Sequence, residues 1–157
     1  MKRKLIRSFS VLLASVITLV LFFNFFYVVE IVDGNSMFPV FENNDKLLIN
    51  KSIGFKGYNR SDIVMCRFAD ENGTFIKRII GISGDEIECK DGRIYRNSED
   101  ITDSYYPDTY IKDDFGKVTV AENMYFVVGD NINISKDSRQ NGCITRTQII
   151  GRIETKL

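Results

Sequence analysis

The feature that most constrains this chain is an uncharged apolar segment close to its N-terminus. Residues 8–29 contain no Asp, Glu, Lys or Arg and consist mainly of Val, Leu, Ile and Phe. At a rise of about 1.5 Å per residue, an α-helix of this length spans roughly 33 Å, close to the thickness of the hydrocarbon core of a bilayer. The sequence therefore predicts a transmembrane helix over residues 8–29, although a packed strand would explain residues 25–32 equally well.

A cleaved secretory signal peptide is the main alternative for this segment, because it also begins basic and then becomes apolar. Its apolar core is usually about 7–15 residues long and is followed by small residues at the cleavage site. Here the apolar run is longer, and it ends in the bulky residues 25–29. We therefore expect the segment to be retained as a membrane anchor.

Every charged residue before the apolar run is basic: Lys2, Arg3, Lys4 and Arg7. Basic residues beside a membrane span keep that end of the chain in the cytoplasm. The sequence thus predicts a cytoplasmic tail over residues 1–7, a single-pass plasma-membrane anchor over residues 8–29 and an extracytoplasmic domain over residues 30–157.

The chain has no histidine, and its 21 Lys and Arg residues balance its 21 Asp and Glu residues. The lack of histidine excludes Ser-His-Asp triads, Cys-His dyads and imidazole metal sites. No basic cluster follows residue 7, so the electrostatic footprint of a nucleic-acid-binding protein is missing. Cys66, Cys89 and Cys143 form no CxxC pair, and we expect neither a metal nor a cofactor.

From residue 30 onward, short runs of β-forming residues alternate with Gly, Asn and Asp, which is typical of a mostly-β domain. The Asp91-Gly92 pair between two such runs predicts a tight hairpin. Residues 97–114 are polar and weakly periodic, and we expect them to form a surface excursion on the sheet. The predicted strands lie near residues 27–32, 46–50, 62–68, 74–82, 86–90, 93–96, 117–120, 125–128 and 149–154.

Ser36 lies in a segment, residues 33–39, that contains the turn-forming residues Gly34, Asn35 and Pro39. A serine on such a turn can expose its hydroxyl group and leave a backbone N–H free, which suits a nucleophile. Serine is also common in turns that have no chemical role, and composition alone favours this second interpretation.

Lys77 occupies an unusual position within a predicted strand. Alternate residues of a strand share a face, so Phe75, Lys77 and Ile79 lie on the same side. If that face packs on the core, burial disfavours the ammonium form and lowers the pKa of the amine, as a general base near neutral pH requires. The alternative is a lysine at a sheet edge whose amine reaches water.

A third polar cluster, residues 128–139, follows another predicted strand. Ser135 could orient a neutral lysine amine through a hydrogen bond, and Asp137 with Arg139 could brace the loop. A solvated polar loop is the alternative interpretation. None of the three clusters establishes a function alone.

Together and in this order, the clusters closely resemble the sequence boxes of the type I signal peptidases, membrane-bound serine proteases that use a Ser-Lys dyad. The serine motif of that family, Ser-Met-x-Pro preceded by Gly-x, is matched by residues 34–39. Its Gly-Asp-Ile-Val box is similar to residues 61–64, and its lysine box, Lys-Arg-Val-Ile-Gly-x-x-Gly-Asp, to residues 77–85. Its last box, Gly-Asp-Asn-x-x-x-Ser-x-Asp-Ser-Arg, is similar to residues 129–139. The small size and the single anchor resemble the Gram-positive branch.

The resemblance implies a β-rich catalytic domain behind one N-terminal transmembrane helix, and it implies roles for individual residues. Ser36 would be the nucleophile, Lys77 the general base and Ser135 the hydroxyl group that positions the lysine. Further supporting residues would be Asp137, Arg139, Arg78 and Asp130. The substrate cleft would be lined by Val32, Met37, Phe41, Phe75 and Ile76.

The activity implied by the resemblance is the removal of signal peptides from exported precursor proteins at the outer membrane surface. Cleavage would follow small residues and would need no cofactor or metal. Two alternatives remain open: a related Ser-Lys protease that processes itself, and a membrane-anchored β-domain without catalysis, as an inactive paralogue or a partner-binding module. The chain departs from the family pattern at Gly34, where some members have an oxyanion-binding serine, and at Ile132 and Ile134, which replace polar residues.

Overall fold

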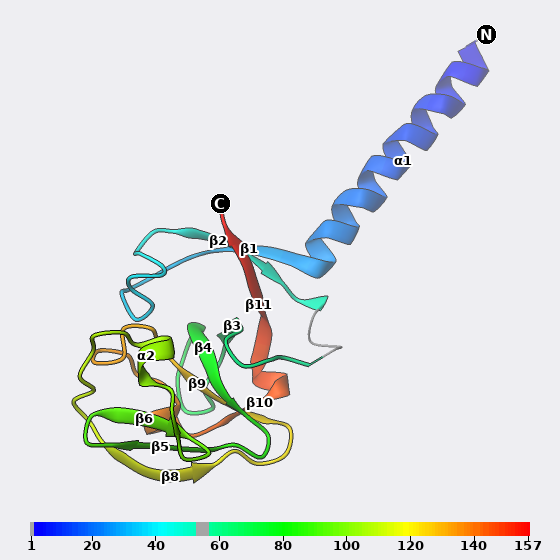
Figure 1. Cartoon of the computed structure of the whole chain (residues 1–157). Coiled ribbons are helices and arrows are strands. Elements are labelled where there is room, and N and C mark those ends of the chain that lie inside the picture. The colour runs from blue at the N-terminus through cyan, green and yellow to red at the C-terminus, as the bar shows by residue number, and fades with distance from the viewer. Residues whose placement is uncertain (1, 53–56) are drawn as a thin grey trace.

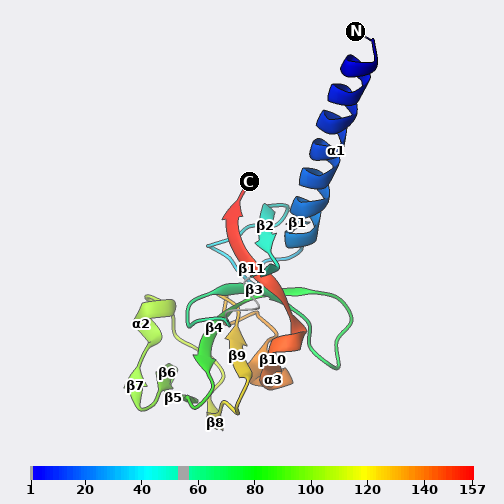
Figure 2. The same ribbon diagram turned by 90° about the vertical axis from the view of Figure 1, so that its right-hand side faces the viewer.

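The first element of the structure is a long helix that projects from a β-rich body. The computed structural model describes residues 2–52 and 57–157, without the side chains of residues 2–6. Helix α1 (Lys2–Phe26) extends away from the body in both views (Figures 1 and 2). Its segment Arg7–Phe26 is long and apolar enough to cross a membrane, and its most apolar stretch is not buried against the rest of the protein. The side chains of the predicted basic tail at residues 1–6 lie outside the described residues.

The helix ends before the predicted end of the span. Tyr27 begins strand β1 (Tyr27–Ile31), so residues 27–29 belong to a strand and not to the helix. The cause is pairing: β1 forms an antiparallel ladder with β2 (Lys46–Asn50). The end of an apolar helix and an apolar strand have the same composition, so only pairing with a partner strand distinguishes the two structures. For these residues the alternative interpretation as a strand is correct.

The body contains two antiparallel sheets, which confirms the predicted mostly-β fold. The larger sheet has the strand order β1-β2-β11-β3-β4-β9-β10, and the smaller one has the order β7-β6-β5-β8. The remaining strands of the larger sheet are β3 (Ile63–Cys66), β4 (Phe75–Ile82), β9 (Met124–Val128), β10 (Ile144–Thr145) and β11 (Ile149–Lys156). The smaller sheet consists of β5 (Glu86–Lys90), β6 (Arg93–Arg96), β7 (Glu99–Asp100) and β8 (Phe115–Thr119). Short helical segments α3 (Ser138–Asn141) and η2 (Arg146–Gln148) flank β10.

The predicted strands agree with the observed ones except where a strand is very short. Strands β7 and β10 have two residues each, too few for alternation to be recognised in the sequence, and neither was predicted. The predicted Asp91-Gly92 hairpin is confirmed, because Lys90 pairs with Arg93 across it. Both turn residues have positive φ, 53° at Asp91 and 74° at Gly92, as a type I′ turn requires.

Residues 97–114 are mostly exposed, as the predicted surface excursion requires, but the segment is also anchored in the core. This segment contains a one-turn helix, α2 (Thr102–Tyr105), and buries Ile101, Tyr106 and Ile111. These three side chains join a core cluster to which both sheets contribute. They are spaced five residues apart in the sequence, a spacing that matches neither a strand nor a helix. The sequence does not predict these core contacts, because the segment packs through irregular structure.

We predict that Ile111→Ala lowers the free energy of unfolding by about 2–4 kcal/mol, because it removes a fully buried side chain and leaves a cavity. Ile134→Ala is the matched control, since Ile134 is 63% exposed and should change stability by less than about 0.5 kcal/mol. Denaturant unfolding of the detergent-solubilised protein measures both. Equal effects of the two substitutions would contradict the burial of Ile111.

Candidate active site

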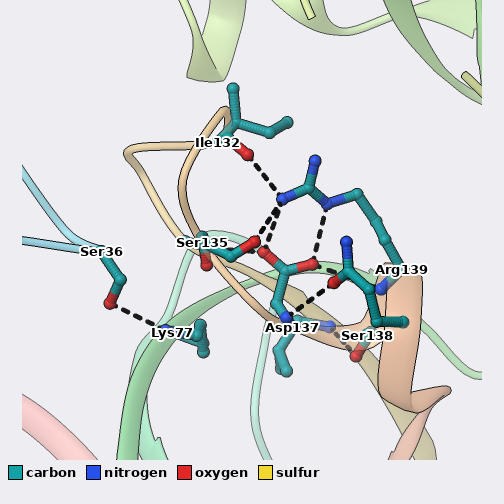
Figure 3. Close-up of polar contacts among 10 residues, drawn as sticks. Ser36, Lys77, Ile132, Ser135, Asp137, Ser138 and Arg139 are labelled. Atoms are coloured by element: carbon teal, nitrogen blue, oxygen red, sulfur yellow. Dashed lines mark hydrogen bonds and ion pairs between the residues drawn. The ribbon is translucent and has the colours of Figure 1, made fainter. Parts of the chain in front are cut away.

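Ser36 and Lys77 meet in the structure although they are far apart in the sequence. Ser36 lies in the turn that follows β1, and Lys77 lies within β4. The Lys77 Nζ atom donates a hydrogen bond of 2.8 Å to Ser36 Oγ (Figure 3). The serine turn and the lysine strand, which the sequence marks as separate anomalies, therefore form one polar contact.

Lys77 is buried, which decides between the two interpretations that the sequence leaves open. Only 2% of the residue is exposed, and Ile79 on the same face of β4 is fully buried. The Nζ atom lies 5.8 Å from the centre of the Phe75 ring. Burial lowers the pKa of Lys77 from its ordinary value of 10.5, and the nearby carboxylate of Asp137 acts in the opposite direction. The side chain thus combines a hydrogen bond to a hydroxyl group with an environment that favours a neutral amine.

The serine turn is held by backbone and side-chain contacts at both ends. Gly34 has a φ of 93°, a conformation that favours glycine, and its N–H donates to Asn43 Oδ1 at 2.9 Å. Asn131 donates from its backbone N–H to the Ser36 carbonyl at 3.0 Å and from its side chain to the Asn35 carbonyl at 3.2 Å. Within the part of the chain that the structure describes, the Ser36 N–H donates to no other group. That N–H is free to bind a ligand.

Ser135 lies close to the dyad without bonding to it. A Cβ atom at Gly129 would collide with Ser135 Oγ and with the backbone oxygen of Ser36, so Gly129 allows these groups to approach. Ser135 is buried, and its Oγ atom has no hydrogen-bond partner among the described residues. The hydrogen bond from Ser135 to Lys77 that the sequence suggests is therefore not formed.

Asp137 and Arg139 form a buried ion pair beneath this loop (Figure 3). The Arg139 Nε atom donates to Asp137 Oδ1 at 2.8 Å, and Nη2 donates to the carbonyls of Ile132 at 2.6 Å and Ser135 at 2.9 Å. Asp137 Oδ2 also accepts from the Gly129 N–H at 3.1 Å. One guanidinium and one carboxylate thus hold both sides of the loop, and the predicted bracing contact is present.

Arg78 and Asp130 form a second ion pair on the other face of β4. Arg78 donates from Nε and Nη2 to the two carboxylate oxygens of Asp130 at 2.7 and 2.6 Å. Its Nη1 atom donates to the Ser61 carbonyl at 3.0 Å. Burial alone would lower the pKa of Arg78, but the hydrogen bond to Asp130 raises it, so the guanidinium stays charged.

A cleft of about 420 Å³ opens beside Ser36 and Lys77. Four of the predicted cleft residues line it, namely Val32, Met37, Phe75 and Ile76. Phe41 does not: it packs against Val32, Met37 and Leu47 and faces a different cavity. Its role in binding substrate stays a prediction, since the serine segment places Phe41 in the small core under the turn.

Other cleft residues were missed in the sequence. They are Glu30, Ile31, Asp33, Met65, Asn72, Gly73 and Thr74. Met65 could have been found from strand register, since it pairs with Ile76 across β3 and β4. Glu30 and Ile31 adjoin Val32 directly, but composition gives no sign of which face of β1 meets the cleft.

Neither metal nor disulfide chemistry finds support among the described residues. They contain no group of three or more His, Cys, Asp or Glu side chains that could hold a metal ion. All three cysteines are free. Burial raises the pKa of the Cys66 and Cys89 thiols to about 12, so both are protonated and unreactive near neutral pH.

Comparisons with known proteins identify the family of this chain. Residues 3–157 match the family model for signal peptidase, peptidase S26. The chain belongs to the signal peptidase family. It is 33% identical to signal peptidase I S of Bacillus subtilis (strain 168), over 96% of this chain and 87% of that protein. It is 34% identical to a signal peptidase I of Bacillus amyloliquefaciens, over 89% of this chain and 80% of that protein.

A solved structure supports the same assignment. The crystal structure of a signal peptidase I from Enterococcus faecalis V583 matches with a TM-score of 0.54 and 27% identity, over 62% of this chain and 97% of that chain. The resemblance drawn from the sequence boxes is thus confirmed: the chain is a type I signal peptidase of the Gram-positive type and a serine endopeptidase.

We predict that Lys77→Met raises the free energy of unfolding of this signal peptidase at pH 7. Methionine fills a similar volume without an amine. Because burial lowers the pKa of Lys77 in the folded protein, the unfolded chain binds one more proton between that lowered value and 10.5. Wild-type stability should therefore rise with pH across this window, by about 1.4 kcal/mol for each unit of lowering. The advantage of Lys77→Met should shrink as the pH approaches 10.5.

Denaturant unfolding at several pH values measures this trend. Lys117→Met is the matched control, because the Lys117 side chain is 53% exposed. Its difference from wild type should not vary with pH in the same way. A pH-independent difference for Lys77→Met would show that the folded protein does not lower the pKa of this amine.

Proposed function

We propose that this chain removes N-terminal signal peptides from exported precursor proteins, with Ser36 as nucleophile and Lys77 as general base. The observation that carries the proposal is the 2.8 Å contact between Lys77 Nζ and Ser36 Oγ, made by an amine that is almost completely buried. A lysine can take a proton from a serine near neutral pH only if its own pKa is lowered, and burial is the means available here.

The acylation step follows from this geometry. Neutral Lys77 takes the hydroxyl proton of Ser36 while Oγ forms a bond to the scissile carbonyl carbon. The carbonyl oxygen becomes an oxyanion, and the free N–H of Ser36 is the donor placed to bind it. The carbon–nitrogen bond then breaks, and the Lys77 ammonium gives its proton to the leaving amine.

In the second step, water releases the acyl group from Ser36, and Lys77 again acts as the general base. Lys77 takes a proton from water, and the hydroxide adds to the acyl carbon. Ser36 Oγ then leaves and recovers the proton from Lys77. No step needs a group from outside the chain and the substrate other than water.

Surrounding residues would keep this pair in place rather than react. Asn131 holds the serine turn through the carbonyls of Asn35 and Ser36. Arg139 and Asp137 hold the loop that carries Ser135. We propose that the Ser135 hydroxyl, which makes no hydrogen bond to a described residue, bonds to Lys77 once substrate rearranges the site.

The cleft indicates what kind of peptide binds. Val32, Met37 and Ile76 give it an apolar wall beside the dyad. Such a wall would favour small apolar side chains just before the cut, which agrees with cleavage after small residues in exported precursors.

The position of the dyad agrees with a substrate held in a membrane. Ser36 follows the end of α1 by ten residues, so an extended chain would separate them by at most about 35 Å. We propose that residues 1–6 lie in the cytoplasm, that Arg7–Phe26 spans the plasma membrane and that the body from Tyr27 to Leu157 lies outside. A precursor anchored by its own apolar segment would present its cleavage site at this height.

Ser36→Ala and Lys77→Met should each lower kcat/KM for a precursor by at least about 10³-fold, because each removes one half of a proton-transfer unit. The double variant should be hardly worse than either single variant. Sequencing of the new N-terminus of the product identifies genuine cleavage, and Ser83→Ala, an exposed serine outside the cleft, is the control. Cleavage by Ser36→Ala well above background would refute the assignment of the nucleophile.

The pH dependence of kcat/KM should show an ascending limb that belongs to Lys77. The amine acts only when neutral, so activity rises as the pH passes its pKa, and burial places that pKa below 10.5. Lys77→Arg should be inactive at every working pH, because a guanidinium stays protonated. An ascending limb with the pKa of an unperturbed lysine would argue against a buried neutral base. Appreciable activity of Lys77→Arg would argue against it too.

A further inference from the structure

One side of the cleft comes from the loop between β3 and β4, residues 67–74, which has no role in the chemistry described above. Its residues Asn72, Gly73 and Thr74 line the cleft together with Lys77. Residues 30–33 line the same cleft from a separate segment, the end of β1 and the start of the serine turn. Both segments border the space that a bound peptide would occupy. The position of the β3–β4 loop therefore affects how a peptide lies against Ser36.

The base of the β3–β4 loop is fixed by three contacts. The Arg67 N–H donates to the Gln148 carbonyl at 2.9 Å, and Gln148 Nε2 donates to the Arg67 carbonyl at 3.2 Å. The ring of Phe68 is buried, and its centre lies 5.5 Å from the centre of the Phe75 ring. These contacts reach no further than Phe68, so they do not hold the tip of the loop, residues 69–73.

The tip of the loop is held by one ion pair. Its residues are exposed except Glu71, whose side chain is 26% exposed and accepts a hydrogen bond from Lys136 Nζ. Among the hydrogen bonds and ion pairs of the described residues, this contact alone joins residues 69–73 to another segment. Without it, the tip would have no polar contact with the rest of the protein.

Lys136 belongs to a segment of the site that is itself fixed on both sides. Its neighbours Ser135 and Asp137 are buried. The Ser135 carbonyl accepts a hydrogen bond from Arg139 at 2.9 Å, and the Asp137 N–H donates to Gln140 Oε1 at 3.0 Å. The backbone around Lys136 is thus a firm support for its side chain.

The same segment also contacts the serine turn. The Asn131 N–H donates to the Ser36 carbonyl at 3.0 Å, and the Ser135 N–H donates to the Asn131 carbonyl at 3.0 Å. The ion pair between Glu71 and Lys136 therefore connects one side of the cleft to the segment that holds the nucleophile.

We propose that Glu71 and Lys136 are positioning residues for the cleavage reaction, because their ion pair holds the β3–β4 loop in the place that a bound peptide needs. The inference rests on the proposed function, since it takes the cleft as the site that binds the precursor. Neither residue lines the cleft, so neither contacts the reacting atoms. Loss of the ion pair should weaken peptide binding and raise KM, while proton transfer, and with it kcat, stays nearly unchanged.

The test measures kcat and KM of the full-length, detergent-solubilised protein on an uncharged peptide that contains a cleavage site. Glu71→Lys brings two like charges together and should raise KM about fivefold, with kcat within about twofold of wild type. Lys136→Glu should have the same effect. The double variant Glu71→Lys/Lys136→Glu restores an ion pair with the charges exchanged and should return KM to within about twofold of wild type.

A second exposed ion pair of the same residue types provides the matched control. Lys117 Nζ lies 3.3 Å from Glu86 Oε2 on the smaller sheet, and neither residue lines the cleft. Glu86→Lys should leave kcat and KM within about twofold of wild type. Salt gives an independent check, because it screens an exposed ion pair. The KM of wild type should rise with salt concentration, and the KM of Glu71→Gln should not.

The remaining outcomes separate this inference from the proposed function. An unchanged KM in Glu71→Lys would overturn the inference, and so would a double variant that is no better than the single ones. A fall in kcat as large as the rise in KM would also overturn it, because the ion pair would then act on the chemistry. Equal effects of Glu71→Lys and Glu86→Lys would show a general response to surface charge and overturn it too. Failure of wild type to cut the peptide would count against the proposed function instead.

Discussion

The burial of one amine, that of Lys77, governs the arrangement of the site. A lysine in the interior is unfavourable while it is charged, and the protein places this one at 2% exposure on a central strand of the larger sheet. The serine turn covers it from one side and the loop after β9 from another. Burial of the amine lowers the stability of the fold, but it provides a neutral amine within hydrogen-bond distance of Ser36 Oγ.

The buried carboxylate of Asp137 favours the charged form of Lys77, and the guanidinium of Arg139 opposes this influence. The carboxylate of Asp137 raises the pKa of Lys77, whereas Arg139 lowers it. Arg139 binds Asp137 directly at 2.8 Å, and its charge offsets part of the effect of the carboxylate, while burial remains the largest influence on the pKa of Lys77. The same guanidinium also holds the carbonyls of Ile132 and Ser135. The ion pair between Asp137 and Arg139 therefore holds the loop in shape and also influences the pKa of Lys77.

Patterns over a few neighbouring residues predict those structural features that depend only on interactions between neighbours in the chain. Strand alternation predicts that Lys77 shares a face with Phe75 and Ile79, and Asp91-Gly92 predicts the hairpin, because each depends on neighbours in the chain. The end of the helix at Phe26 and the orientation of Phe41 depend on partners elsewhere, namely β2 and the core under the serine turn. Likewise, no periodicity marks the buried residues of segment 97–114, and the unbonded Ser135 hydroxyl depends on the exact approach of two loops.

The junction between helix and sheet connects the proposed membrane position to the cleft. Helix α1 passes into β1 without a linker, and Lys51 at the end of β2 donates from its N–H to the Phe26 carbonyl and from Nζ to the Asn24 carbonyl. Strand β1 then supplies Glu30 and Ile31 to the cleft. Because anchor and cleft wall are consecutive and tied to the same strand, the depth of the helix in a membrane would set the height of the cleft above it. A flexible linker would let the dyad sample many heights above such a membrane, whereas this junction would hold it at one height.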